Sequence, residues 1–163
     1  MPQPLERNGH IKMNGECHYL ETLYKELALA LGDAVWAFAR IEWLTYEYLR
    51  RLSKDRLDEL VGDLTFSNRT AILCRIVDAR NSSPENKERA LKAIKAAKDL
   101  SEKRNIIVHN PWRIWVDLDS EEFMMQIEKY SKRDKAVDLD ELRRFTKLAG
   151  EVETELKESL NAI

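Results

Sequence analysis

Apolar residues recur at helical spacing along most of the chain. The first run of this pattern predicts a helix over residues 16–52. Gly32 and Asp33 interrupt the run, so two arrangements remain open: one helix that ends there with a second beginning at Ala34, or a single helix with a weak point. Residues 34–52 carry large apolar side chains on most sides. This is typical of a central helix, or of one that also faces a partner.

Further helices are predicted at four places, and polar capping residues mark most of their starts. Ser67 is the expected N-cap of one helix, and Ser83 followed by Pro84 marks the start of the longest. Asp138 with Glu141 three residues later is a variant of the capping box and marks the last. The predicted ranges are residues 55–64, 67–80, 84–108 and 138–160.

Two short strands are predicted before the last helix. Residues 113–117 and 123–130 alternate imperfectly between apolar and polar positions, with a turn at 118–122 between them. The fold class expected is mainly all-α: a bundle of four to five helices with a short β-hairpin excursion before the last helix. A chain of 163 residues has the size of one domain. We expect a single domain over residues 16–163, preceded by a flexible N-terminal arm over residues 1–15.

The composition agrees with a helical protein and limits how a nucleic acid or a membrane could be bound. Only five Gly and four Pro interrupt the chain, and 34% of the residues are charged, which suits solvated helix faces. The formal net charge of −2 provides no global field for a nucleic acid, so any RNA contact must come from a local patch. Cys17 and Cys74 form no C-x-x-C pair, which favours free thiols in a reducing cytoplasm. A cytoplasmic protein is therefore expected, and no membrane partner is expected because no apolar run approaches the roughly 18 residues of a membrane span.

Two charged residues fall on apolar helix faces. Arg104 lies near the middle of an apolar arc on the helix over residues 84–108, and Glu42 lies with the apolar group of residues 34–52. Burying an unpaired guanidinium is costly. We therefore expect Glu42 and Arg104 to meet or to line one cleft; a purely structural ion pair, or two side chains that reach solvent, are the alternatives. The residues of the arc are Ala90, Ala93, Ile94, Ala97, Leu100, Ile107 and Val108.

A polar row accompanies Arg104 on the same helix. Asn105 and His109 are four residues apart and therefore lie on one side. An imidazole can accept and return a proton near neutral pH. Three cations precede the pair, and they form either a solvated face or a stripe that guides phosphates. These cations are Lys92, Lys95 and Lys98.

The stretch Arg104-Asn105-Ile106-Ile107-Val108-His109 resembles the motif of HEPN-family ribonucleases. In that family an Arg is followed by four to six residues and a His at a helix end, and the first intervening residue is often Asn, Asp or His. The residues around the stretch match the family too, with a long helix before it and a sharp break at Pro111 after it. The resemblance implies an HEPN-like helical bundle and metal-independent cleavage of RNA. It also implies a homodimer in which two motifs face each other as one composite site.

The resemblance assigns roles to named residues. His109 would assist attack of the ribose 2′-hydroxyl on the neighbouring phosphate, Arg104 would stabilise the charge that develops there, and Asn105 would orient the phosphate or His109. Glu42 would support the site, and the three lysines would contact RNA phosphates. No metal and no cofactor is expected. Cys17 and His18 lie near His10 in sequence but lack a matching second pair of zinc ligands.

Two functions follow as expectations. The first is an endoribonuclease, such as a toxin or antiphage effector, with RNA as substrate and a cognate antitoxin as a further partner. Some toxin members carry a modified Tyr two residues after the His, where this chain has Pro111, so that type of regulation is not expected. The second is a noncatalytic HEPN-like module that binds protein or nucleotide. A nuclease should place Arg104, Asn105 and His109 in an open cleft, whereas a module should bury Arg104 against Glu42 and leave His109 isolated.

Overall fold

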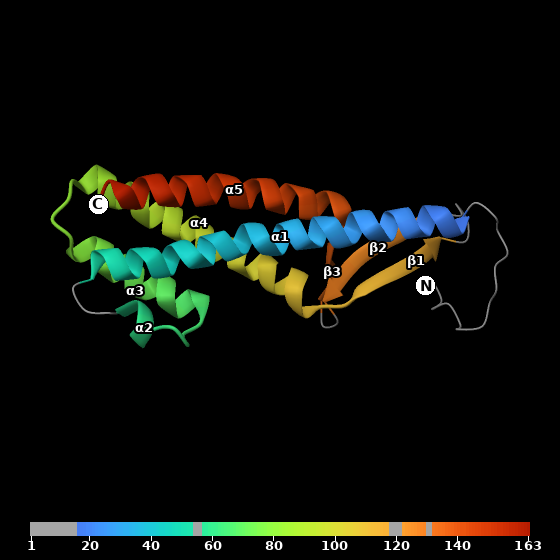
Figure 1. Ribbon diagram of the computed structural model, residues 1–163, viewed down its shortest axis with the longest axis horizontal. Helices are drawn as coiled ribbons and strands as arrows, with labels where there is room; N and C mark the ends of the chain where they lie inside the picture. Colours follow the sequence, from blue (N-terminus) through green and yellow to red (C-terminus); the bar gives the residue numbers. More distant parts are fainter. Residues whose placement is uncertain (1–15, 54–56, 118–121, 130–131) are drawn as a thin grey trace.

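Five helices and a small sheet form the described part of the chain, and the mainly all-α class is confirmed (Figure 1). The computed structural model describes residues 16–53, 57–117, 122–129 and 132–163, so the expected arm over residues 1–15 lies outside it. The elements are α1 (Glu16–Leu52), α2 (Leu57–Leu60), α3 (Phe66–Ala79), α4 (Pro84–His109), β1 (Trp112–Asp117), β2 (Glu122–Lys129), β3 (Lys132–Val137) and α5 (Leu139–Asn161).

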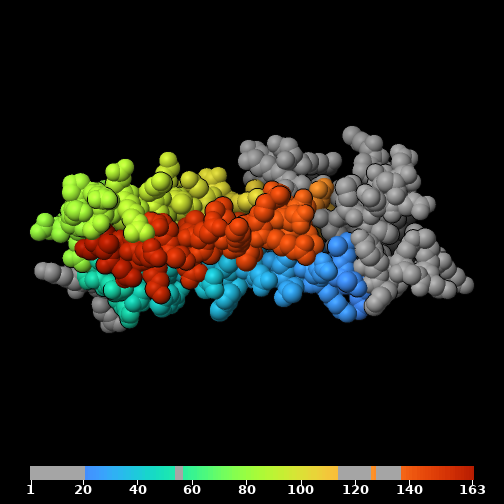
Figure 2. Space-filling view, turned by 90° about the horizontal axis from the view of Figure 1, so that it is seen from above, coloured from blue at the N-terminus to red at the C-terminus, as the bar shows by residue number. Residues whose placement is uncertain are grey.

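Three long helices pack lengthwise around the core. Helices α1 and α5 run in the same direction, and α4 runs against both (Figure 1). In Figure 2, α5 lies along the visible face with α4 on one side and α1 on the other. The interior is almost entirely apolar, as expected for helices that each bury one stripe. Its largest fully buried side chains include Tyr48, Phe38, Ile41, Leu49, Leu73, Ile94, Leu142 and Leu156.

Helix α1 continues through Gly32 and Asp33, so of the two arrangements left open at this point the single helix is the one observed. Ala30 and Ala34 are both buried on the core side, whereas Gly32 and Asp33 are exposed. The apolar stripe therefore passes the glycine without interruption. Packing along this stripe outweighs the roughly 1 kcal/mol that glycine costs inside a helix.

The predicted starts of α4 and α5 are confirmed, whereas that of α3 is wrong. Ser83 and Asp138 cap α4 and α5 by accepting hydrogen bonds from the third amide of each helix. At α3 the N-cap is Thr65 rather than Ser67, and its hydroxyl accepts from the Asn68 amide at 3.3 Å. The earlier start allows Phe66 to pack against the core. Of the predicted helix over residues 55–64, the described part contains the single turn α2, followed by hydrogen-bonded turns.

The predicted hairpin is present, but a third strand extends it. Strands β1, β2 and β3 form an antiparallel sheet in that order, and residues 118–121 of the predicted turn lie outside the described residues. Strand β3 has the sequence Lys-Arg-Asp-Lys-Ala-Val, which lacks apolar alternation and could not be predicted from periodicity. Its last residue, Val137, pairs with Ile127, and both are buried.

No helix within the described ranges is long and apolar enough to cross a membrane.

Candidate functional site

Helices α1, α3 and α4 bring one carboxylate and two guanidinium groups together. Arg104 Nη2 on α4 donates to Glu42 Oε1 on α1 at 2.6 Å, which confirms the contact expected between them. Arg69 Nη2 on α3 lies 3.6 Å from the same Glu42 oxygen. Two arginines therefore share one carboxylate, and we call Glu42, Arg69 and Arg104 the arginine cluster.

The two guanidinium groups lie against aromatic rings. Arg104 lies over the ring of Phe38, with 4.8 Å between the guanidinium carbon and the ring centroid. Arg69 lies over the ring of Tyr46 at 4.2 Å, and its Nη1 donates to the carbonyl oxygen of Leu64 at 2.6 Å. Aromatic faces attract cations more strongly where water is excluded. This packing holds both arginines in fixed positions without neutralising their charge.

The arginine cluster has more positive than negative charge. Two guanidinium groups face one carboxylate, so within this cluster one positive charge is unbalanced. The Nε atoms of Arg69 and Arg104 are both buried and have no hydrogen-bond partner among the described residues. The Arg69 side chain is only 6% exposed, compared with 21% for Arg104 and 31% for Glu42. Buried donors without partners are rare in native proteins, so this cluster has unused hydrogen-bonding capacity.

A hollow opens next to the arginine cluster. Its volume is about 370 Å³, and it combines all three charged residues with the start of α3 and one turn of α4. Polar atoms make up much of its wall. Its lining residues are Glu42, Leu64, Thr65, Phe66, Ser67, Arg69, Ser101, Arg104 and Asn105.

The hollow contains two of the three motif residues. Arg104 and Asn105 line it, but His109 does not. His109 occupies the last turn of α4, where it is exposed and forms no hydrogen bond or ion pair with the described residues. Arg104 and His109 are five positions apart, which turns them about 140° from each other around the helix. A single copy of the chain therefore does not bring Arg104, Asn105 and His109 together at one hollow.

The structure contains part of the site geometry expected for each of the two functions. Arg104 pairs with Glu42, although its side chain is 21% exposed rather than buried, and His109 has no partner among the described residues, as expected for a binding module. Arg104 also lines an open hollow beside Asn105, as expected for a nuclease. Val108 departs from the predicted apolar arc because it is 41% exposed, whereas the rest of the arc is buried.

The lysine row is exposed but does not form a continuous stripe of cations. Lys92, Lys95 and Lys98 are all exposed on α4. The pKa of Glu155 on α5 is lowered mainly by the hydrogen bond from Arg89, and the charge of Lys92 also lowers it. Lys92 therefore lies near α5. Lys98 shares a face with Asn105 and His109, but the exposed Glu102 lies between them on that face.

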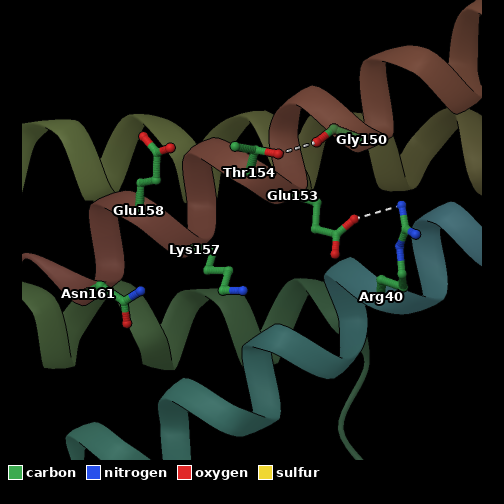
Figure 3. A pocket seen from close by; sticks show the side chains of 7 residues that line it. All are labelled: Arg40, Gly150, Glu153, Thr154, Lys157, Glu158 and Asn161. Atoms are coloured by element: carbon green, nitrogen blue, oxygen red, sulfur yellow. Dashed lines mark hydrogen bonds and ion pairs between the residues drawn. The ribbon is translucent and has the colours of Figure 1, made fainter.

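A larger hollow lies elsewhere, between α1 and α5 (Figure 3). Its volume is about 590 Å³. The Arg40–Glu153 ion pair at 2.8 Å crosses it, and Lys157 and Glu158 lie further along the same wall. Its cations and carboxylates balance one another, and none of the motif residues lines it. Size alone therefore does not identify the functional site.

Arg69 was not among the site residues predicted from the sequence, although its spacing from apolar residues marks it as core-facing. It lies four and eight residues before Leu73 and Val77, so it occupies a core-facing row of its helix. The same reasoning singled out Arg104 on its own helix. With the N-cap placed at Ser67, Arg69 falls in the first turn of the predicted helix, whereas the observed helix begins at Phe66.

Comparison of the chain with protein-family models, with curated proteins and with solved structures gave no match. In the ranges that the structure describes, no group of three or more His, Cys, Asp or Glu side chains is placed to hold a metal ion. The geometry of the arginine cluster and its hollow is therefore the basis for a functional proposal.

Proposed function

We propose that this protein is a metal-independent endoribonuclease whose active site is completed in a homodimer. The observation that carries the proposal is the position of Arg104. Its guanidinium is held by Glu42 at the wall of an open hollow that Asn105 also lines. A fixed cation at the edge of an accessible cavity can stabilise negative charge that develops on a phosphate.

In the proposed reaction, the ribose 2′-hydroxyl attacks the adjacent phosphorus and the 5′-oxygen leaves. His109 accepts the proton of the 2′-hydroxyl, and a proton is returned to the leaving oxygen. The products are a 2′,3′-cyclic phosphate and a 5′-hydroxyl. Because Arg104 and His109 diverge around α4, a second copy that faces the motif supplies the groups that one chain does not bring together.

The exposed face of α1 supports self-association of the chain, on the side of α1 that borders α5 rather than on the side of the motif. Trp36 and Trp43 are 68% and 61% exposed, and Leu29 is 69% exposed one heptad earlier. Gly32 and Ala39 lie between them on the same face and are also exposed. Large side chains that alternate with small ones can interdigitate with a second copy of the same face. Apolar side chains gathered on one face are typical of an interface.

The test is cleavage of single-stranded RNA in excess EDTA, beside DNA of the same sequence. We expect the RNA to be cut and the DNA to remain intact, because only RNA supplies the internal nucleophile. His109→Ala should reduce the rate roughly 10²–10⁴-fold, and Arg104→Ala about 10²–10³-fold. Lys95→Ala should instead weaken binding and reduce its salt dependence.

Circular dichroism and light scattering on the same samples verify that each variant is folded and report its oligomeric state. A species that stays monomeric at micromolar concentration would contradict the composite site. Cleavage that EDTA abolishes would exclude the mechanism. Cleavage that survives in the His109→Ala/Arg104→Ala double variant would place the activity at another site.

One observation favours a second candidate, a noncatalytic module that binds protein or nucleotide. In the described part of the chain, His109 has no partner to orient it, whereas a general base is usually positioned by a neighbouring group. If a well-folded dimer cuts no RNA, the binding module becomes the better account of the same hollow.

A further inference from the structure

The N-terminus of α3 opens into the same hollow as the arginine cluster. Thr65, Phe66 and Ser67 all line it. Thr65 already satisfies two donors of the first turn, since its hydroxyl accepts from the Asn68 amide and its carbonyl from the Arg69 amide. The amides of Phe66 and Ser67 have no acceptor within the helix. They lie at the positive end of the helix dipole, where an anion is favoured.

Arg69 is an independent observation that points to an anion. It is 95% buried, because its relative exposure is 5%, and it lines the hollow. Its Nη1 donates to Leu64 and its Nη2 approaches Glu42, but its Nε has no partner in the described part of the chain. A buried guanidinium that shares one carboxylate with a second guanidinium is costly unless a further anion balances the charge. The fold places this cation beside the amides of Phe66 and Ser67, which have no acceptor within the helix.

Glu42 contributes one negative charge to the site but does not satisfy all the donors of the two arginines. A single oxygen, Glu42 Oε1, contacts both arginines, at 2.6 Å to Arg104 and 3.6 Å to Arg69. One carboxylate oxygen cannot satisfy two forked guanidinium groups, each of which has five N–H donors. An anion with several oxygens would satisfy more of these donors and would compete with Glu42 for them.

We propose that this hollow binds a phosphate group between Arg69, Arg104 and the N-terminus of α3. Phosphate has the oxygens needed to accept from the guanidinium groups and from the amides of Phe66 and Ser67 together. The hollow is within the size range of small-molecule sites. The phosphate belongs either to a free nucleotide or to the backbone of RNA. The inference concerns binding and does not require that RNA is cut.

The experiment is a titration of the full-length protein, followed by amide and arginine Nε NMR signals, at an ionic strength held constant with NaCl. The probes are inorganic phosphate, a nucleoside 5′-monophosphate, and a short single-stranded RNA without a terminal phosphate. We expect saturable binding with shifts at the amides of Phe66 and Ser67. Tighter binding of the monophosphate identifies a nucleotide site, and tighter binding of the RNA identifies a backbone subsite.

Three variants test the assignment. Arg69→Gln should weaken binding about tenfold or more, because it removes charge-assisted hydrogen bonds. Arg75→Gln is the matched control, since Arg75 is an exposed arginine on α3 that does not line the hollow; its affinity should equal that of the wild type. Glu42→Gln should bind phosphate more tightly, because it removes the competing carboxylate while both arginines remain.

The outcomes separate this inference from the proposed cleavage. Phosphate binding that follows the variant pattern supports the site even if no RNA is cut. The inference is overturned if neither the wild type nor Glu42→Gln binds any probe saturably, or if Arg69→Gln and Arg75→Gln bind equally well. Should Arg69→Gln fail to fold, the decision rests on Glu42→Gln: unchanged or weaker phosphate binding by that variant overturns the proposal.

Discussion

Two clusters of arginine and carboxylate join helices of this protein, and they are built in opposite ways. Between α4 and α5, Arg89 donates to both oxygens of Glu155 at 2.6 and 2.9 Å and to Glu158 at 2.9 Å. One guanidinium therefore has two carboxylates. In the arginine cluster, two guanidinium groups share one oxygen of Glu42. The first cluster has an excess of acceptors, and the second has an excess of donors.

Their surroundings differ as well. The side chains of Arg89, Glu155 and Glu158 are 45–59% exposed, so water completes their hydrogen bonds and screens their charges. The arginine cluster lies against the rings of Phe38 and Tyr46, and two of its buried donors have no partner among the described residues. A saturated, solvated cluster joins two helices and offers little to a ligand. An unsaturated, partly buried cluster can recognise an anion.

The largest difference is expected when each cluster loses a central arginine. Arg69→Ala should lower the free energy of unfolding by about 3 kcal/mol, because it removes a charge-assisted hydrogen bond to Leu64 and the stacking on Tyr46. Arg89→Ala should change it little, since its partners return to water. Urea denaturation of the two variants measures both effects. Equal losses would show that burial does not distinguish the two clusters.

A smaller difference is expected for the carboxylates. Glu42→Gln should cost about 1–2 kcal/mol, less than a fully buried pair, because Glu42 and Arg104 are 31% and 21% exposed. The loss should persist in 1 M NaCl, since partly buried pairs are weakly screened. The matched control is Glu155→Gln, whose effect should be small at low salt and absent at high salt. A Glu42→Gln effect that vanishes in 1 M NaCl would place this pair with ordinary surface pairs.

The smallest effect concerns pH and the exposed cluster. The hydrogen bond from Arg89 lowers the pKa of Glu155 below its ordinary value of 4.5. Because this pKa is lower in the folded state, the carboxylate stabilises the fold at pH values above its ordinary pKa of 4.5. This stabilisation is lost as the pH falls through the lower pKa of the folded state. Wild type should therefore be slightly more stable than Glu155→Gln at pH 7, and the gap should narrow at a pH below 4.5, the ordinary pKa of the carboxyl. Denaturation midpoints at both pH values measure it; a gap that widens on acidification would contradict this assignment.

Much of the helical architecture could be predicted because its causes are local. Ser83 with Pro84 and Asp138 with Glu141 start helices through hydrogen bonds within one turn. The contact between Glu42 and Arg104 was also predictable, because each charge stands out on an otherwise apolar helix face. The continuity of α1 at Gly32 could not be decided in this way, since it depends on how the stripe packs against other helices.

The sequence by itself determined the helices, most of their caps, and that Glu42 and Arg104 lie on apolar helix faces, because these follow from periodicity and short-range hydrogen bonding. Only the tertiary structure decided that Arg69 joins Glu42 and Arg104, that the start of α3 opens beside them, and that β3 adds to the hairpin. Each of these depends on residues far apart in the chain, whose meeting is set by how whole helices and strands pack. The motif was therefore visible in the chain, but the excess of positive charge around it arises only when three helices come together.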